Sequence, residues 1–252
     1  MNWAMHFLGT GGAQAVELGS TAAVLERDGA PLLLIDCGAD TLTSYLETYG
    51  VPPTAVYITH THMDHVGGLE RLFYRLHFDE ALRGRTRIFV HAALVPWLQA
   101  RVADYPRVLA EGGVNFWDSL HLLPCSRGFW LAGYWFDVFA TRHHAPSTSF
   151  GVGLRGAFVF TGDTRPIPEV LAQQAPGNER IFHDCGLIGN PSHSGADDLE
   201  REYPPALRAR LVASHYGSAA EADALVARGM LVAQPGQRIA LAEPSLPRAD
   251  AG

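Results

Sequence analysis

Residues 60–65 read His-Thr-His-Met-Asp-His and constrain this chain more than any other stretch. They follow residues 55–58, an apolar run typical of a buried strand. In an extended segment alternate side chains point the same way, so the first two histidines can bind one metal ion. A turn at the methionine lets the aspartate and the last histidine reach a second ion. The sequence therefore predicts a metal site on a loop, with candidate ligands His60, His62, Asp64 and His65.

This motif is the signature of the metallo-β-lactamase superfamily, and three later motifs resemble the remaining ligand motifs of that family. Residues 141–147 resemble its third-histidine motif, residues 161–164 its bridging-aspartate motif, and residues 213–217 its last-histidine motif. Each follows an apolar, strand-like run. The resemblance implies an α/β fold, the αββα sandwich, in which two mixed β-sheets are flanked by helices and the metal loops gather along one edge.

The resemblance also implies two divalent metal ions, with zinc expected and manganese or iron as alternatives. One ion is expected on His60, His62 and His144, and the other on Asp64, His65 and His215, with Asp163 bridging them. Asp64 is also a candidate catalytic residue. The third histidine is ambiguous because His143 adjoins His144, and neighbouring residues at a strand end face opposite ways. The spacing of His144 to residues 146–147 resembles the family pattern better, so we choose His144.

A supporting residue is expected at Asp36, within a segment that resembles the family's next motif after its first strand and glycine turn. In relatives the matching aspartate holds the ligand loop, and metal ligands need such partners to fix their ring orientation. The alternative is that Asp36 caps a helix beginning near Thr41.

Finer motifs resemble the phosphodiesterase branch of the superfamily, which includes tRNase Z and cyclic-nucleotide phosphodiesterases. They are the aromatic-glycine pair in residues 147–151 and the residues 183–185 and 191–194 that precede the last histidine. The resemblance makes His193 a candidate catalytic proton donor, with capping of a helix near Ala196 as the alternative. His183 is expected to donate to Asp163 or another ligand.

The function predicted on this basis is a dinuclear metal-dependent phosphodiesterase that uses a metal-activated hydroxide on a small or nucleotide-like diester. The alternatives are hydrolysis of a carboxylic ester, lactone, thioester or lactam, and a non-hydrolytic iron enzyme or metal-binding accessory protein. The net charge of −7 and the absence of a dense basic run argue against a long nucleic acid as substrate. The long arm by which tRNase Z grips its substrate is also absent.

The organisation is that of one hydrolase domain over residues 1–242, followed by a flexible tail over 243–252. Three widely spaced cysteines favour reduced thiols. No apolar run approaches the roughly 20 residues that span a bilayer, so we expect a soluble, cytoplasmic protein without a membrane partner. A homodimer is compatible with the sequence, and no residue is assigned to an organic cofactor.

The periodicity of apolar residues predicts the secondary structure. Strands are expected at 3–8, 21–26, 31–35, 55–58, 86–90, 114–117, 120–122, 134–140, 180–183 and 211–213, with a hairpin over 151–160. Helices are expected at 41–49, 93–103, 167–173 and 219–227, and from about 69 and 196 onward.

Overall fold

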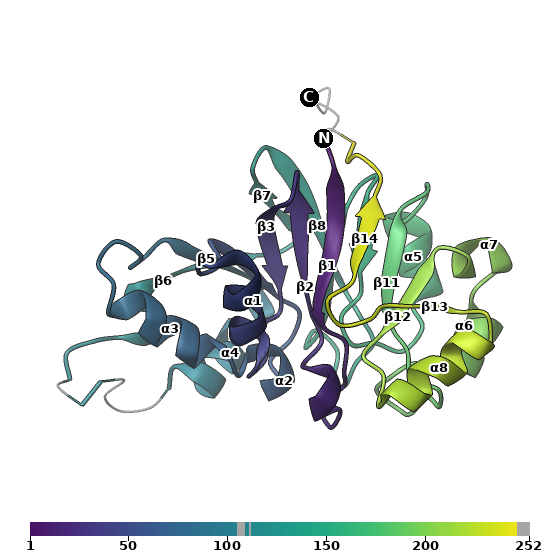
Figure 1. Ribbon diagram of the computed structural model, residues 1–252, viewed down its shortest axis with the longest axis horizontal. Helices are drawn as coiled ribbons and strands as arrows, with labels where there is room; N and C mark the ends of the chain where they lie inside the picture. Colours follow the sequence, from purple (N-terminus) through teal and green to yellow (C-terminus); the bar gives the residue numbers. More distant parts are fainter. Residues whose placement is uncertain (105–108, 111, 246–252) are drawn as a thin grey trace.

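Two seven-stranded sheets pack face to face at the centre of the protein, and helices lie on their outer sides (Figure 1). This computed structural model describes residues 1–104, 109–110 and 112–245. The first sheet has the order β14 (Arg238–Leu241), β1 (Trp3–Gly9), β2 (Ala22–Arg27), β3 (Ala30–Ile35), β4 (Ala55–Ile58), β5 (Thr86–His91), β6 (Leu120–Cys125). The second has the order β13 (Leu231–Val232), β12 (Leu211–Ser214), β11 (Arg180–Asp184), β10 (Phe158–Phe160), β9 (Phe150–Leu154), β8 (Tyr134–Ala140), β7 (Gly128–Leu131).

The helices follow the strands in both halves of the chain. The α-helices are α1 (Thr41–Tyr49), α2 (Met63–Val66), α3 (Leu69–His77), α4 (Val95–Val102), α5 (Pro168–Gln174), α6 (Ala196–Glu202), α7 (Pro205–Arg208) and α8 (Ala219–Ala227). Short 3-10 helices lie at η1 (Val16–Leu18), η2 (Ala92–Leu94) and η3 (Phe116–Ser119). Two mixed sheets flanked by helices confirm the predicted αββα sandwich.

Aromatic side chains from facing strands fill the space between the sheets. Phe7 on β1 contacts Phe182 on β11, with ring centroids 5.3 Å apart. Farther along, Phe129 on β7 stacks on Phe89 of β5 at 4.1 Å and lies 5.7 Å from Tyr57 of β4. Such rings bury large apolar areas and add specific edge and stacking contacts, so they hold the two sheets together as one core.

A seam joins the sheets at one edge, where residues 59–60 after β4 meet residues 149–150 before β9. The Phe150 amide donates to the Thr59 carbonyl at 2.9 Å, and His60 forms an isolated bridge with Ser149. From within β4, the Tyr57 hydroxyl reaches the carbonyl oxygens of Phe150 and Gly151, each at 3.2 Å. The loop after β4 is therefore fixed to the second sheet.

Strand direction brings the loops that carry the predicted ligands to this same edge. Strand β4 is parallel to β3 and β5, and β10, β11 and β12 are parallel to one another. Strand β8 runs in the same direction as β10, because β9 lies between them and is antiparallel to both. The carboxyl ends of such strands meet at one edge. In Figure 1 this is the lower edge, where α2 and the turn after β1 lie.

Most predicted elements are confirmed, but the strand expected at 114–117 is wrong. The chain instead forms η3, because the Asn115 side chain accepts from the Trp117 amide at 2.9 Å and Asp118 accepts from the Asn115 amide at 2.9 Å. This capping box satisfies the first amides of a helical turn and outweighs the apolar pattern. Only residues 243–245 of the predicted tail are described, and there the Ser245 amide donates to Arg155.

All three cysteines are buried and unpaired, as predicted for reduced thiols. Within the described ranges, no helix combines the length and the apolar character that a bilayer crossing requires.

Candidate metal centre

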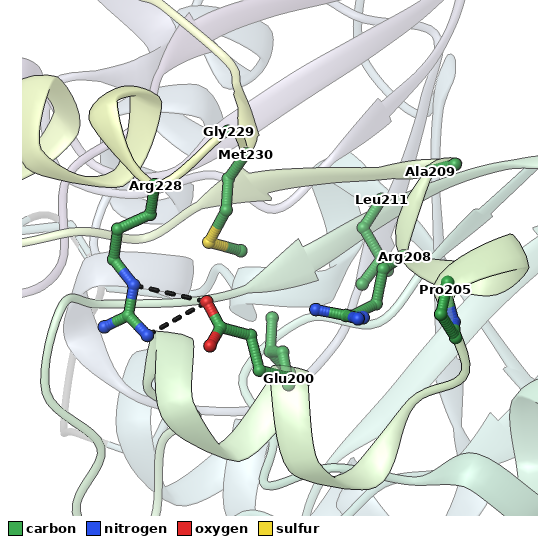
Figure 2. A pocket seen from close by; sticks show the side chains of 9 residues that line it. Glu200, Pro205, Arg208, Ala209, Leu211, Arg228, Gly229 and Met230 are labelled. Atoms are coloured by element: carbon green, nitrogen blue, oxygen red, sulfur yellow. Dashed lines mark hydrogen bonds and ion pairs between the residues drawn. The ribbon is translucent and has the colours of Figure 1, made fainter.

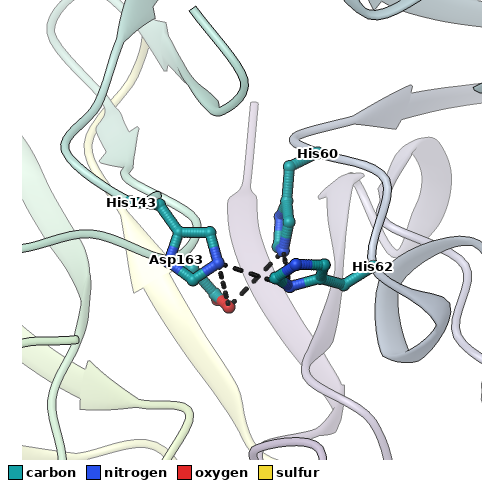
Figure 3. Close-up of side chains that lie close together, drawn as sticks. All are labelled: His60, His62, His143 and Asp163. Atoms are coloured by element: carbon teal, nitrogen blue, oxygen red, sulfur yellow. Dashed lines mark hydrogen bonds and ion pairs between the residues drawn. The ribbon is translucent and has the colours of Figure 1, made fainter. Parts of the chain in front are cut away.

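Three histidines and an aspartate converge at the edge where β4, β8 and β10 end (Figure 3). His60 Nε2 lies 3.1 Å from His62 Nδ1, and His143 Nε2 lies 3.3 Å from the same atom. The Asp163 carboxylate faces this group, 3.6 Å from His60 and 3.8 Å from His143. We call the three histidines the imidazole group.

The structure brings His143, and not the expected His144, into the imidazole group. His143 is buried, and its Nδ1–H donates to the Ser192 carbonyl at 3.0 Å, which turns Nε2 toward His62. His144 is exposed, and its ring lies 4.0 Å from that of His143 and 4.8 Å from that of His62. The two side chains therefore do not face opposite ways, and the one whose ligand atom joins His60 and His62 is His143 rather than the chosen His144.

A second group lies on the other side of Asp163 and consists of Asp64, His65 and His215. His65 Nε2 is 3.4 Å from Asp64 and 3.5 Å from Asp163. His215 Nε2 is 3.5 Å from Asp64 and 3.3 Å from Asp163. Asp163 therefore contacts both groups, in the position where a bridging ligand was expected. We call this second set the acidic group.

Unpaired atoms show that these side chains fit divalent cations. Nε2 of His65 and Nε2 of His215 are buried, and neither has a hydrogen-bond partner among the described residues. Buried polar atoms are normally paired, so each requires another partner. Two donors about 2.0–2.1 Å from a tetrahedral zinc ion lie roughly 3.3–3.4 Å from each other, which is close to the separations in both groups. Imidazole and carboxylate are ligands that zinc accepts.

The electrostatics of the imidazole group favour the protonation states that bind metal. Burial lowers the pKa of His60 and His62, and it lowers the pKa of His143 to about 4. These rings are thus neutral near pH 7, with a lone pair available. Burial opposes the ionisation of Asp163, yet the neighbouring His215, His65 and His60 bring its pKa well below the usual range. An anionic carboxylate therefore faces neutral imidazoles.

Asp36 supports the ligand loop from behind, as the family resemblance implied. Its carboxylate accepts from His65 Nδ1 at 2.8 Å, from the Thr59 amide at 2.8 Å and from the Thr59 hydroxyl at 2.7 Å. These bonds hold the His65 ring with Nε2 toward Asp163. Asp36 has a left-handed backbone, with φ 63°, and so does His215, with φ 65°. Such strain in residues other than glycine concentrates at functional sites.

His193 lies at the mouth of the centre and is paired with a buried carboxylate. Its Nδ1–H donates to Asp184 at 2.8 Å, and the Thr164 amide donates to the same oxygen at 2.9 Å. Burial disfavours the charged form of His193, but the hydrogen bond and charge of Asp184 raise its pKa above the ordinary value. Gly195, rather than His193, occupies the N-cap of α6, so the alternative capping role does not apply.

The sequence reasoning missed Asp184 and misplaced its neighbour. His183 was expected to reach Asp163, but its Nε2 contacts the Tyr203 hydroxyl at 2.8 Å on the far side of β11. Successive strand residues face opposite sides, so Asp184 is the one that points to the site. With Asp163, His193 and His215 it forms a further set of potential ligands. The sequence did contain a signal for Asp184, because it is an acidic residue at the end of β11, the strand parallel to β10.

The centre opens into a cavity of about 370 Å³. Its walls come from the turn after β1, the two ligand groups and the loop after β11, including Gly12, Gln14, Ile188, Asn190, His193 and Glu221. A cavity of about 210 Å³ between α6, α7 and α8 is lined without histidine or aspartate, and its Glu200 pairs with Arg228 at 2.9 Å (Figure 2). The grouped histidines thus make the first cavity the candidate functional site.

The fold and this edge cluster define a metallo-β-lactamase-fold protein. The chain superposes on the metallo-β-lactamase-fold protein YhfI from Bacillus subtilis with a TM-score of 0.73 at 15% identity, covering 95% of this chain and 100% of that one. It superposes on a diphosphatase of the PhnP family with a TM-score of 0.72 at 17% identity, covering 97% and 98%.

The particular family follows from the sequence. The chain belongs to the family described as Anti-Pycsar protein Apyc1, which matches residues 3–239. The Anti-Pycsar protein Apyc1 of Paenibacillus harenae is 29% identical to it over 224 residues, covering 84% of this chain and 89% of the relative.

Proposed function

We propose that this protein is a dinuclear metal-dependent phosphodiesterase that hydrolyses a small cyclic nucleotide. The carrying observation is the position of Asp163 between the imidazole and acidic groups, with the His193–Asp184 pair beside it. The name of the relatives, Anti-Pycsar protein, suggests degradation of a cyclic nucleotide and supports the substrate class.

The proposed ligands divide along the two groups. His60, His62 and His143 hold one ion, Asp64, His65 and His215 hold the other, and Asp163 serves both. Bound there, two divalent ions, zinc in the first instance, supply a nucleophilic hydroxide and neutralise charge on the phosphoryl oxygens. Burial opposes the ionisation of Asp64, but the neighbouring His215 and His65 bring its pKa well below the usual range. Asp64 thus also acts as a fixed anion that orients the attacking water.

His193 supplies the proton that the leaving group needs. Asp184 occupies Nδ1, which leaves Nε2 to face the substrate, and the hydrogen bond and charge of Asp184 raise the pKa of the ring, which favours its protonated form. As water adds to phosphorus it releases one proton to solvent, the bond from phosphorus to one ribose oxygen breaks, and that oxygen takes the proton from Nε2, which solvent then reprotonates. The product is a linear nucleoside monophosphate. A ribose alkoxide is a poor leaving group, so this proton lowers the barrier.

Cavity size and charge favour a single nucleotide over a long nucleic acid. The cavity of about 370 Å³ lies in the range typical of small-molecule sites. The net charge of the chain is −7, whereas long polyanions are bound through many basic contacts.

The test is a substrate-class comparison on protein of known metal content. Elemental analysis counts the ions per chain, and 3′,5′-cyclic nucleotides are compared with bis(p-nitrophenyl) phosphate, a lactone and a thioester. We expect cyclic nucleotides to give linear monophosphates, with activity lost on chelation and restored by zinc. Rapid hydrolysis of the lactone or thioester with intact cyclic nucleotides would show that the centre serves carbonyl chemistry instead.

A further inference from the structure

A second hollow of about 330 Å³ lies directly beside the metal cavity, between η1 and the start of α2. The two hollows share four lining residues, which are Gly12, Ala13, Ala15 and Asp64. The second is bounded on its other sides by Val16, Met63 and Asp40. We call it the Val16–Met63 hollow. Because Asp64 belongs to both walls, a ligand at the metal centre has direct access to this space.

Two exposed apolar side chains flank the Val16–Met63 hollow. Val16 is 85% exposed and Met63 is 50% exposed, although the residue two positions after each, Leu18 or His65, is buried. Scattered exposed apolar residues are ordinary, but two that line one hollow beside the candidate metal centre offer an apolar surface to a ligand. The Met63 thioether is flexible and polarizable, which suits contact with the face of a ring.

Asp40 adds a fixed hydrogen-bond acceptor to this apolar surface. Its carboxylate accepts from the Ser20 amide at 3.1 Å and the Ser20 hydroxyl at 2.6 Å, which holds its orientation. No basic side chain of the described residues pairs with it. Each carboxylate oxygen accepts more than one hydrogen bond, so Asp40 can still receive N–H groups of a ligand. It also repels a second phosphate in the hollow.

We propose that the Val16–Met63 hollow is the nucleobase subsite of this enzyme. The base lies flat between Val16 and Met63 and directs an N–H edge toward Asp40, while the phosphate lies at Asp163. This inference rests on the proposed cyclic-nucleotide function. A nucleobase matches the surface because it combines apolar faces with N–H donors at its edge. Cytosine, adenine and guanine offer an exocyclic amine and uracil an imide N–H, so Asp40 accepts all four and excludes an additional phosphate.

The test separates recognition of the base from chemistry at the phosphate. Purified, metal-loaded Val16→Ser/Met63→Gln and Asp40→Asn variants are compared with wild type on cyclic nucleotides and on methyl p-nitrophenyl phosphate, which has no base. We expect the ratio of kcat/KM for the cyclic nucleotide over the base-free diester to fall about tenfold in the double variant, through KM. Asp40→Asn should lower the ratio by a smaller factor. The matched control, Val226→Ser, changes an equally apolar, 53% exposed residue on α8 and should leave the ratio unchanged.

Two failures are distinguishable. Wild-type protein that cleaves no cyclic nucleotide would remove the proposed function and the subsite together. Wild-type protein that cleaves them, with variants that keep the wild-type ratio, would overturn the subsite alone. Equal losses on both substrates, or a fall in bound metal measured by elemental analysis, would also overturn it, because Met63 would then act only through its neighbours in the ligand loop.

Discussion

Histidine and carboxylate side chains are combined in the metal centre and also in a buried cluster around Glu26, and the two are built in opposite ways. The Glu26 cluster is formed by side chains of β1, β2, α1 and β14. Glu26 accepts from the Tyr49 hydroxyl at 2.6 Å and from Arg238 at 3.0 Å, while His6 contacts the same hydroxyl at 2.9 Å. All its buried side-chain N and O atoms have partners, whereas at the metal centre His65 and His215 each keep an unpaired buried nitrogen. The Glu26 cluster, in which every such atom is paired, stabilises the fold; the metal centre, in which two nitrogens are unpaired, is completed by a ligand.

The largest expected effect comes from removing the residue that both ligand groups share. Asp163→Ala should reduce activity to background and lower the metal content of both groups, because one carboxylate contacts His65, His215 and His60. Elemental analysis and turnover measure this. Asp223→Ala, at an exposed aspartate on α8, is the control. A variant that keeps two ions per chain would contradict the shared role of Asp163.

The next comparison separates two adjacent histidines. His143→Ala should lose metal from the imidazole group and nearly all activity, since Nε2 points toward His62. His144→Ala should keep its metal content, because that side chain is exposed. Both variants are measured for bound metal and for turnover at saturating zinc. The reverse result would restore His144 as the ligand.

His193 lies beside the two ligand groups but belongs to neither, so its removal should change the turnover rate and leave the metal content unchanged. His193→Ala should keep its metal and slow cleavage of a cyclic nucleotide by roughly 10²–10⁴ if it delivers a proton. The loss should be smaller for p-nitrophenyl diesters, because p-nitrophenolate leaves without protonation. Loss of metal in this variant would instead place His193 with Asp163, Asp184 and His215 as a ligand.

The smallest effect on turnover is expected from a substitution in the Glu26 cluster. Glu26→Ala should leave activity intact but lower the free energy of unfolding by about 1–3 kcal/mol, because Tyr49 and Arg238 lose their acceptor. Denaturant unfolding measures the change. Glu47→Ala, at an exposed position on α1, should stay within about 0.5 kcal/mol of wild type. Lost activity at unchanged stability would show that this cluster is not only structural.

The contiguous part of the site could be predicted from the sequence, because ligand spacing and strand alternation act within a few residues. His60 and His62 follow β4 directly and do meet at one point. The choice between His143 and His144 could not be predicted, since it depends on how the chain turns after β8. There the Arg142 amide bonds the Thr164 hydroxyl at 3.0 Å, and the Arg142 carbonyl accepts from the Arg165 amide at 2.7 Å.

The pairing of His193 with Asp184 also could not be predicted from the sequence, because it too depends on how a loop turns. They lie nine positions apart in the sequence, and the intervening loop folds back through Asn190, whose side chain accepts from the His193 amide at 3.0 Å. No periodic pattern encodes such a return. The Val16–Met63 hollow likewise forms only when η1 and α2 lie side by side. The end of η1 at Leu18 and the start of α2 at Met63 are 45 positions apart in the sequence.

The seam between the sheets has a consequence for slow motions of the protein. The Phe150 amide is bonded to the carbonyl of Thr59, one residue before the first ligand histidine, and Ser149 bridges His60 itself. Hydrogen exchange at Phe150 therefore requires the sheets to part at the metal edge, and its rate reports the opening free energy of that edge. Metal binding should slow hydrogen exchange at the Phe150 amide far more than at the amides of Glu26 or Arg27 on β2. The exchange rate of this one amide therefore measures assembly of the metal site without an activity assay.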